Sequence, residues 1–157
     1  MNFEEQAAEI YVRMASHFSP ENEVLASLWL DMGMQEKQHA GLLQFCIAEE
    51  MFASTLPTDT EIQKAEELFA RLSKRGKDPD LSVNEAFQIA AELEASEINA
   101  IYCNLTTPVH ASMYLLRRKI MISMPDHVER LLAEGRKFGI PEPIMEQLRR
   151  AQESCPS

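Results

Sequence analysis

The chain has 157 residues, 45% of them hydrophobic and only five of them glycine, which favours one compact helical domain with a sizeable core over a disordered protein. Its formal net charge of −10 argues against nucleic acid or an anionic membrane as a partner. The three cysteines, Cys46, Cys103 and Cys155, form no CxxC pair, so we do not expect a zinc ribbon, a rubredoxin-type iron centre or a disulfide framework.

Apolar residues recur at helical spacing along the chain, and no segment shows the sustained alternation of a β-strand. The first helix is predicted over residues 2–18 and ends before Pro20. The second helix is predicted over 21–53 and is unusually long. A short amphipathic helix is expected at 59–74, within the connection that follows.

The third long helix is predicted over residues 82–105. Ser82 and Glu85 at its start have the S-x-x-E spacing of a capping box, in which each side chain bonds to the backbone amide of the other residue. The fourth long helix is predicted over 109–138, where Pro125 is expected to kink or split it because proline removes a backbone hydrogen bond.

Gly139 is expected to end this fourth helix as a C-terminal cap residue, and a last short helix is predicted at 141–153. Short links make antiparallel hairpins of the first two and of the last two long helices, whereas the connection over 54–81 can cross from one end of a bundle to the other. This connectivity predicts an all-α four-helix bundle with one long crossover. We assign the bundle domain to residues 1–139 and a short helix with a tail to 140–157.

Polar residues that can bind a metal interrupt the apolar stripes of these helices. On the second helix, Glu36 and His39 continue the stripe that contains Trp29 and Met32, so both are expected to point inward. Residues three apart on a helix project from one face, and Glu36 and His39 can therefore reach a single ion. The other inward carboxylate and imidazole side chains are predicted to be Glu4, Glu94, Glu97 and His127.

Glu4 and Glu36 are expected at one level, since each lies about 23–25 Å along its helix from the first interhelical turn. Burying four carboxylates without partners costs several kcal/mol each, so they must protonate, pair with cations or bind a metal. Carboxylate oxygen with imidazole nitrogen suits iron or manganese, with zinc as a further possibility. The alternative is an internal salt-bridge network in which Arg117, Arg118 and Lys119 neutralise the carboxylates.

Three segments resemble motifs of a known family. They are "EEQAAEIY" with Glu4 and Tyr11, "EKQH" with Glu36 and His39, and "ELEASEINAIY" with Glu94, Glu97 and Tyr102. On these motifs, residues 2–138 resemble the rubrerythrin-like branch of the ferritin-like superfamily, whose members are di-iron carboxylate four-helix bundles. The resemblance implies iron as the cofactor, with reduction of peroxide or oxidation of ferrous iron as the activity.

The resemblance also implies the ligands of the two ions. The first ion would be held by Glu4, Glu36, His39 and Glu97. The second would use Glu94 and His127, but Met124 stands where the family has a glutamate, and Asp126 faces elsewhere unless Pro125 distorts the helix. The second ion is therefore expected to bind weakly or not at all.

Peroxide reduction is expected to need an external electron donor, because the paired cysteines of a rubredoxin-like domain are missing. Tyr11 and Tyr102 are expected either to donate hydrogen bonds to the carboxylates or to be ordinary core tyrosines. The alternative function is a non-catalytic ferritin-like module for metal binding or interaction that has lost the second metal site. We expect a homodimer that pairs through exposed apolar faces. We also expect a cytoplasmic protein, since no apolar run approaches the roughly 18 residues of a membrane span.

Overall fold

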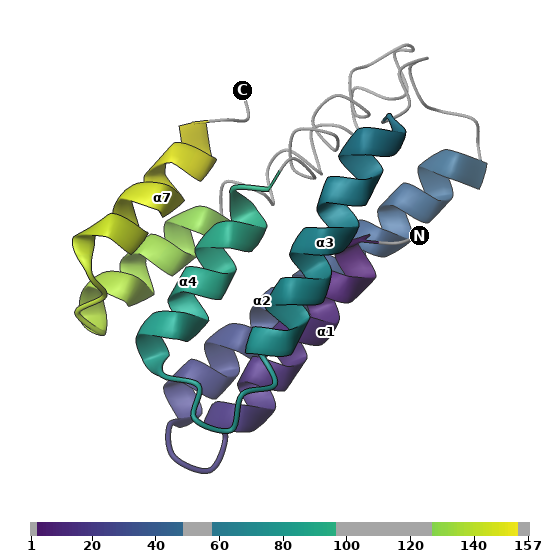
Figure 1. Cartoon of the computed structure of the whole chain (residues 1–157). Coiled ribbons are helices and arrows are strands. Elements are labelled where there is room, and N and C mark those ends of the chain that lie inside the picture. The colour runs from purple at the N-terminus through teal and green to yellow at the C-terminus, as the bar shows by residue number, and fades with distance from the viewer. Residues whose placement is uncertain (1–2, 49–57, 97–126, 154–157) are drawn as a thin grey trace.

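The computed structural model describes residues 3–48, 58–96 and 127–153, and every regular element within these ranges is a helix (Figure 1). The elements in chain order are α1 (Phe3–Phe18), α2 (Glu23–Ala48), α3 (Asp59–Arg75), α4 (Val83–Glu94), the helical segment 127–137 and α7 (Glu142–Glu153). The prediction of an all-α chain is confirmed for these residues. Among their helices, none is both long enough and apolar enough to cross a membrane.

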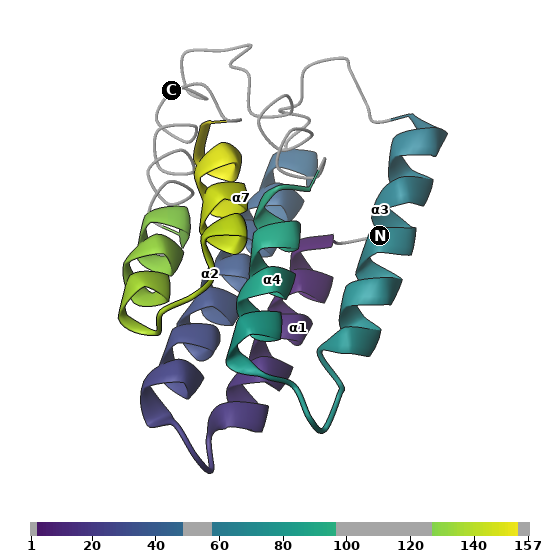
Figure 2. The same ribbon diagram turned by 60° about the vertical axis from the view of Figure 1, so that its left-hand side comes forward.

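α1 and α2 form an antiparallel pair and lie side by side in both views (Figure 1 and Figure 2). A tight turn joins them, in which the amide of Asn22 donates to the carbonyl of Phe18 over 2.8 Å. The helices approach closely at Gly33, where an added Cβ would lie 3.1 Å from the carbonyl oxygen of Ala8. Glycine at this position therefore allows the two backbones to touch, whereas a larger residue would push the helices apart.

α3 begins with a capping box in which Thr58 accepts from the amide of Glu61, and Glu61 accepts in turn from the amide of Thr58 over 2.7 Å. One face of α3 is apolar and buried, with Ala65, Phe69 and Leu72 in the core. This face packs against α1. The connection between the second and third predicted long helices thus contributes a full helix to the core.

α4 begins at the predicted capping box, in which Ser82 and Glu85 bond reciprocally, and this prediction is confirmed. The prediction of a continuous helix to residue 105 is wrong, because α4 ends at Glu94. The amide of Ala95 bonds back to carbonyls of the last turn, and the amide of Ser96 closes a tighter turn of the 3₁₀ type with a carbonyl three residues earlier. No glycine or proline marks this end, so the sequence pattern carries no sign of it.

The helical segment 127–137 ends at Gly139, as predicted, and Gly139 has a left-handed φ of 65°. The amide of Ile140 bonds to the carbonyl of Gly135 over 2.9 Å, which is the long hydrogen bond of a Schellman motif. This motif turns the chain so that α7 packs against α4 and buries Met145 and Leu148 (Figure 2).

The helices predicted over residues 2–18, 59–74 and 141–153 are confirmed as α1, α3 and α7, with residue 2 outside the described residues. The helix predicted over 21–53 is confirmed as far as Ala48, and its last five positions lie outside the described residues. Of the helix predicted over 109–138, the structure describes the part from 127 onward, so the effect of Pro125 stays a prediction.

Aromatic rings fill the centre of the core. Trp29 of α2 stacks on Tyr11 of α1 with ring centroids 6.0 Å apart, and it meets Phe87 of α4 edge-on at 5.0 Å. All three side chains are fully buried. The rings therefore join α1, α2 and α4, the helices that also carry the inward polar residues described below.

Candidate metal centre

Two metal-binding side chains lie on the inner face of α2. Trp29 and Met32 of this face point into the core, and Glu36 and His39 follow on the same stripe. Both are 6% exposed. Nδ1 of His39 lies 3.2 Å from Oε2 of Glu36, within hydrogen-bonding distance. The predicted inward direction of both side chains is confirmed.

A second imidazole approaches this pair from the helical segment 127–137. His127 is 2% exposed, and its ring stacks on that of His39 with centroids 5.0 Å apart. Its Nδ1 lies 3.4 Å from Oε1 of Glu36 and 4.0 Å from Oε1 of Glu94. The Glu36 carboxylate is thus flanked by one imidazole at each oxygen.

Glu36, His39 and His127 together form a group that can hold a metal ion. One ligand atom from each lies within 4.8 Å of the other two. Ligand atoms bound to one ion at about 2 Å are at most about 4 Å apart, so small side-chain rotations suffice to close the group around an ion. One carboxylate oxygen and two imidazole nitrogens form a donor set that suits iron, manganese or zinc.

Two further carboxyl groups border this cluster. Glu4, in the first turn of α1, is 7% exposed and shares a hydrogen bond with the carboxyl group of Glu36. Glu94, in the last turn of α4, is 6% exposed, and its Oε1 accepts a hydrogen bond of 2.9 Å from the hydroxyl of Tyr11. The expected hydrogen bond from Tyr11 to a carboxylate is therefore confirmed. Three carboxyl groups and two imidazoles are gathered in the protein interior.

The buried carboxyl groups differ in their affinity for protons. Burial, together with the nearby charge of Glu36, raises the pKa of Glu4 well above its usual range and also raises the pKa of Glu94. Burial also acts to raise the pKa of Glu36, but hydrogen bonds from His127 and His39 outweigh it and hold that pKa well below its usual range. Glu4 and Glu94 therefore bind protons more tightly than Glu36 does, which limits the repulsion among the three carboxyl groups.

Five of the six predicted ligands meet at this place, namely Glu4, Glu36, His39, Glu94 and His127. The resemblance assigned His127 to a second ion, whereas the structure places it against Glu36 of the predicted first site. Several residues of the sequence analysis lie outside the described ranges: Glu97, Tyr102, Arg117, Arg118, Lys119, Met124 and Asp126. The roles suggested for them stay predictions.

The sequence analysis missed one contact that helps to place His127. Arg130, one turn further along the same helix, pairs with Asp31 of α2. The two residues are 99 positions apart in the chain, so no local pattern could reveal their pairing. The ion pair connects α2 to the helix that supplies the second imidazole.

The candidate metal centre is defined by the arrangement of its side chains. Five ionisable groups from four helical segments converge in the interior, and three of them offer ligand atoms at metal-binding separations. No family model, characterised protein or solved structure matches the chain. On its own geometry, the site is a buried Glu36, His39 and His127 group that can hold a metal ion.

Proposed function

We propose that the protein is a rubrerythrin-like iron-binding protein of the ferritin-like superfamily, which reduces peroxide or oxidises ferrous iron at this centre. The observation that carries the proposal is the convergence of Glu36, His39 and His127 within 4.8 Å in the interior. Iron is the preferred ion because two imidazoles and one carboxylate are a common ligand set of non-haem ferrous centres. Manganese and zinc accept the same donor atoms and are the competing ions.

The chain's own residues would do three things in such a reaction. Glu36, His39 and His127 would hold the ion through one oxygen and two nitrogens. A bound ion would lower the pKa values of Glu4 and Glu94, since its positive charge opposes the burial that raises them, and would thereby favour release of their protons. The surrounding apolar core would exclude bulk water. A bound iron ion supplies the redox chemistry, and reducing peroxide to water takes two electrons and two protons, with the electrons from an external donor.

The same proposal includes a four-helix bundle formed by α1, α2, α4 and the helix that contains residues 127–137, with α3 in the crossover. The antiparallel α1 and α2, and the contributions of all four helices to one polar cluster, support it. A homodimer and a cytoplasmic location belong to this proposal as well. Exposed apolar side chains on α1 and α2 offer a surface where a second copy can pair, namely Val12, Leu30 and Met34. Sedimentation of the purified protein will show whether it is a dimer.

Metal analysis of protein purified without a chelating tag tests the proposed centre. We expect at least one iron per chain in the wild type and loss of that iron in the double variant His39→Gln with His127→Gln. His17→Gln is the matched control, because His17 bonds to the carbonyl of Leu81 and lies on α1 outside the cluster. A wild type without metal, or equal metal in the double variant and the control, would contradict the proposal.

A second function, a non-catalytic ferritin-like module, is favoured by one observation. The polar cluster is held together by its own hydrogen bonds, since Glu36 is bonded to His39, His127 and Glu4. Such a cluster can persist in a bundle that keeps its fold and no longer catalyses a reaction. Mixing the protein loaded with ferrous iron with peroxide, and following oxidation of the iron, distinguishes the two functions. Stoichiometric oxidation followed by re-reduction supports the enzyme, whereas bound metal that peroxide does not oxidise, or intact folding with no metal, supports the module.

A further inference from the structure

We propose that α3 is a strap that sets the positions of Glu4 and Glu94, with Phe69, Arg71 and Arg75 as the positioning residues. The inference rests on the proposed metal centre, whose two bordering carboxyl groups come from α1 and α4. α3 contacts both of these helices near the turns that carry the carboxyl groups. None of the three positioning residues belongs to the cluster itself.

The contact with α1 is made by two aromatic rings. Phe69 of α3 stacks on Phe3 of α1, with ring centroids 5.4 Å apart and planes 25° from parallel. Phe69 is 2% exposed, and Phe3 packs against the same core. Phe3 directly precedes Glu4 in the first turn of α1, where the backbone lacks part of its helical hydrogen bonding. The packing of Phe3 therefore restrains the turn from which the Glu4 carboxyl group projects.

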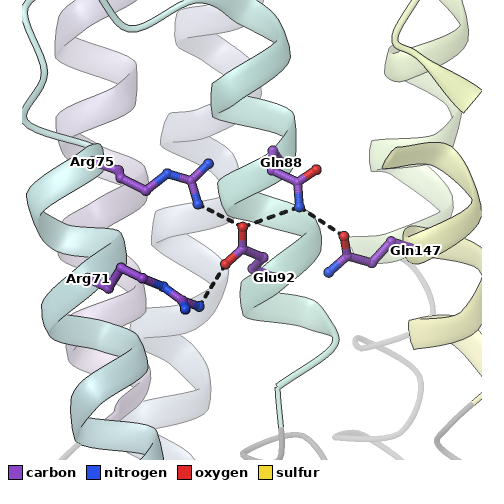
Figure 3. A network of polar contacts seen from close by, with 5 residues as sticks. All are labelled: Arg71, Arg75, Gln88, Glu92 and Gln147. Atoms are coloured by element: carbon purple, nitrogen blue, oxygen red, sulfur yellow. Dashed lines mark hydrogen bonds and ion pairs between the residues drawn. The ribbon is translucent and has the colours of Figure 1, made fainter. Parts of the chain in front are cut away.

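The contact with α4 is made by an ionic network (Figure 3). Arg71 donates to one oxygen of Glu92 over 2.9 Å, and Arg75 donates to the other over 2.7 Å. Gln88 also donates to Glu92 and extends the network to Gln147 of α7. Two guanidinium groups on one carboxylate link α3 to α4.

Glu92 is two positions before Glu94, so the two side chains leave α4 on nearly opposite faces. Glu94 points into the cluster, whereas Glu92 is directed at α3 (Figure 3). Restraining Glu92 thus restrains the last turn of α4 just before the helix ends at Glu94. The end of a helix frays unless other groups hold it, and here the guanidinium groups of α3 do so.

Phe69 and Arg71 lie two positions apart on α3, so they leave the helix on nearly opposite faces, one towards α1 and the other towards α4. The same stretch of α3 therefore contacts both the turn of Glu4 and the turn of Glu94, in addition to the direct hydrogen bond between Tyr11 and Glu94. Groups that hydrogen-bond directly to metal ligands alter metal affinity about 10–100-fold when they are removed. The contacts of α3 are one residue further from the centre, so we expect effects at the lower end of this range. α3 should therefore influence the metal affinity and the geometry of the centre, although it contributes no metal ligand itself.

Cobalt binding tests the strap, because Co²⁺ fits nitrogen and oxygen ligands and its visible absorption bands report their geometry. We expect Phe69→Ala to weaken Co²⁺ binding about tenfold and to shift these bands, and Phe69→Leu, which restores most of the volume, to recover both. The double variant Arg71→Gln with Arg75→Gln should shift the bands in a similar way. The matched control is Phe18→Ala, which removes a buried ring at the opposite end of α1.

Hydrogen exchange of the metal-free protein provides a readout that does not depend on the metal. In the peptide covering Phe3–Ile10, exchange should be faster in Phe69→Ala than in the wild type, and unchanged in Phe18→Ala at a temperature where both variants are folded. Equal effects of Phe69→Ala and Phe18→Ala on exchange and on Co²⁺ binding would overturn the strap. If the wild type binds no Co²⁺, the proposed centre fails, and the exchange result still decides whether α3 holds the first turn of α1.

Discussion

The hydroxyl of Tyr11 in α1 donates a 2.9 Å hydrogen bond to Oε1 of Glu94 in α4, and both side chains are buried. The bond ties the third turn of α1 to the carboxyl group at the end of α4. Burial raises the pKa of Tyr11 well above its usual range, so its hydroxyl keeps its proton and remains a donor at neutral pH. The hydrogen bond acts to lower the pKa of Glu94, against the larger effect of burial, which raises it.

The first prediction concerns this hydroxyl. Tyr11→Phe should lower the free energy of unfolding by about 1–3 kcal/mol, because it leaves a buried carboxyl oxygen without its donor. Urea unfolding of the metal-free protein, followed by the emission of Trp29, the only tryptophan, measures this change. The same substitution in α1 should also weaken metal binding near neutral pH, since Glu94 would hold its proton more tightly. An unchanged unfolding free energy would show that the bond contributes nothing to stability.

The second prediction concerns the stability of the metal-free protein at different pH values. The pKa values of Glu4 and Glu94 are raised, so their contribution to stability is complete below the unfolded value of 4.5 and is lost as the pH rises through the folded values. The pKa of Glu36 is lowered, so its contribution is complete above 4.5 and is lost as the pH falls. Stability should therefore decrease as the pH rises above 4.5.

Glu4→Gln provides the test of this pH dependence, because glutamine has the shape of a protonated glutamate and does not ionise. Chemical unfolding at several pH values above 4.5 should show a smaller decrease in stability for Glu4→Gln than for the wild type. Glu9→Gln, on the exposed side of α1, is the control and should behave as the wild type does. A wild-type free energy of unfolding that increases with pH over this range would contradict the prediction.

The third prediction concerns protons released on metal binding. Because burial raises the pKa values of Glu4 and Glu94, an ion that takes their carboxylates as partners competes with protons for them. Calorimetry of Zn²⁺ binding in two buffers with different ionisation enthalpies should show net release by the wild type and less release by Glu4→Gln. Equal release by both proteins would place Glu4 outside the metal's influence.

The fourth prediction compares two glycines of α2. A Cβ at Gly33 would lie 3.1 Å from the backbone carbonyl of Ala8, so Gly33→Ala should push α1 away and cost about 1–3 kcal/mol. A Cβ at Gly41 would have no heavy atom of the described residues within 4 Å, so Gly41→Ala should stabilise the helix by up to about 1 kcal/mol. Thermal unfolding of both variants measures the contrast. Equal effects would show that α1 and α2 do not pack closely at Gly33.

The inner faces of α1 and α2 could be predicted because helical periodicity links residues that are near in sequence. Glu36 and His39 interrupt a stripe of apolar residues, and that stripe faces the core. Glu4 could be placed at their level because the turn between α1 and α2 is short and the rise of a helix is constant. The capping box at Ser82 and the end at Gly139 were likewise predictable, since each depends on neighbouring residues.

The end of α4 at Glu94 could not be predicted, because it has neither glycine nor proline nor a break in the apolar pattern. The approach of His127 to Glu36 was also out of reach, since it depends on how two helices distant in the chain pack together. Periodicity indicates which side of a helix is buried, but it carries no information about which helix covers that side.

The sequence by itself therefore determined which side chains face the interior, because that choice depends on local hydrophobic spacing. The tertiary structure alone decided that His127 joins Glu36 and His39 within 4.8 Å, and that α3 packs its Phe69 ring on the turn next to Glu4. The physical reason is that contacts between distant segments arise from the packing of whole helices. Patterns among neighbouring residues constrain that packing only by indicating which face of each helix is buried.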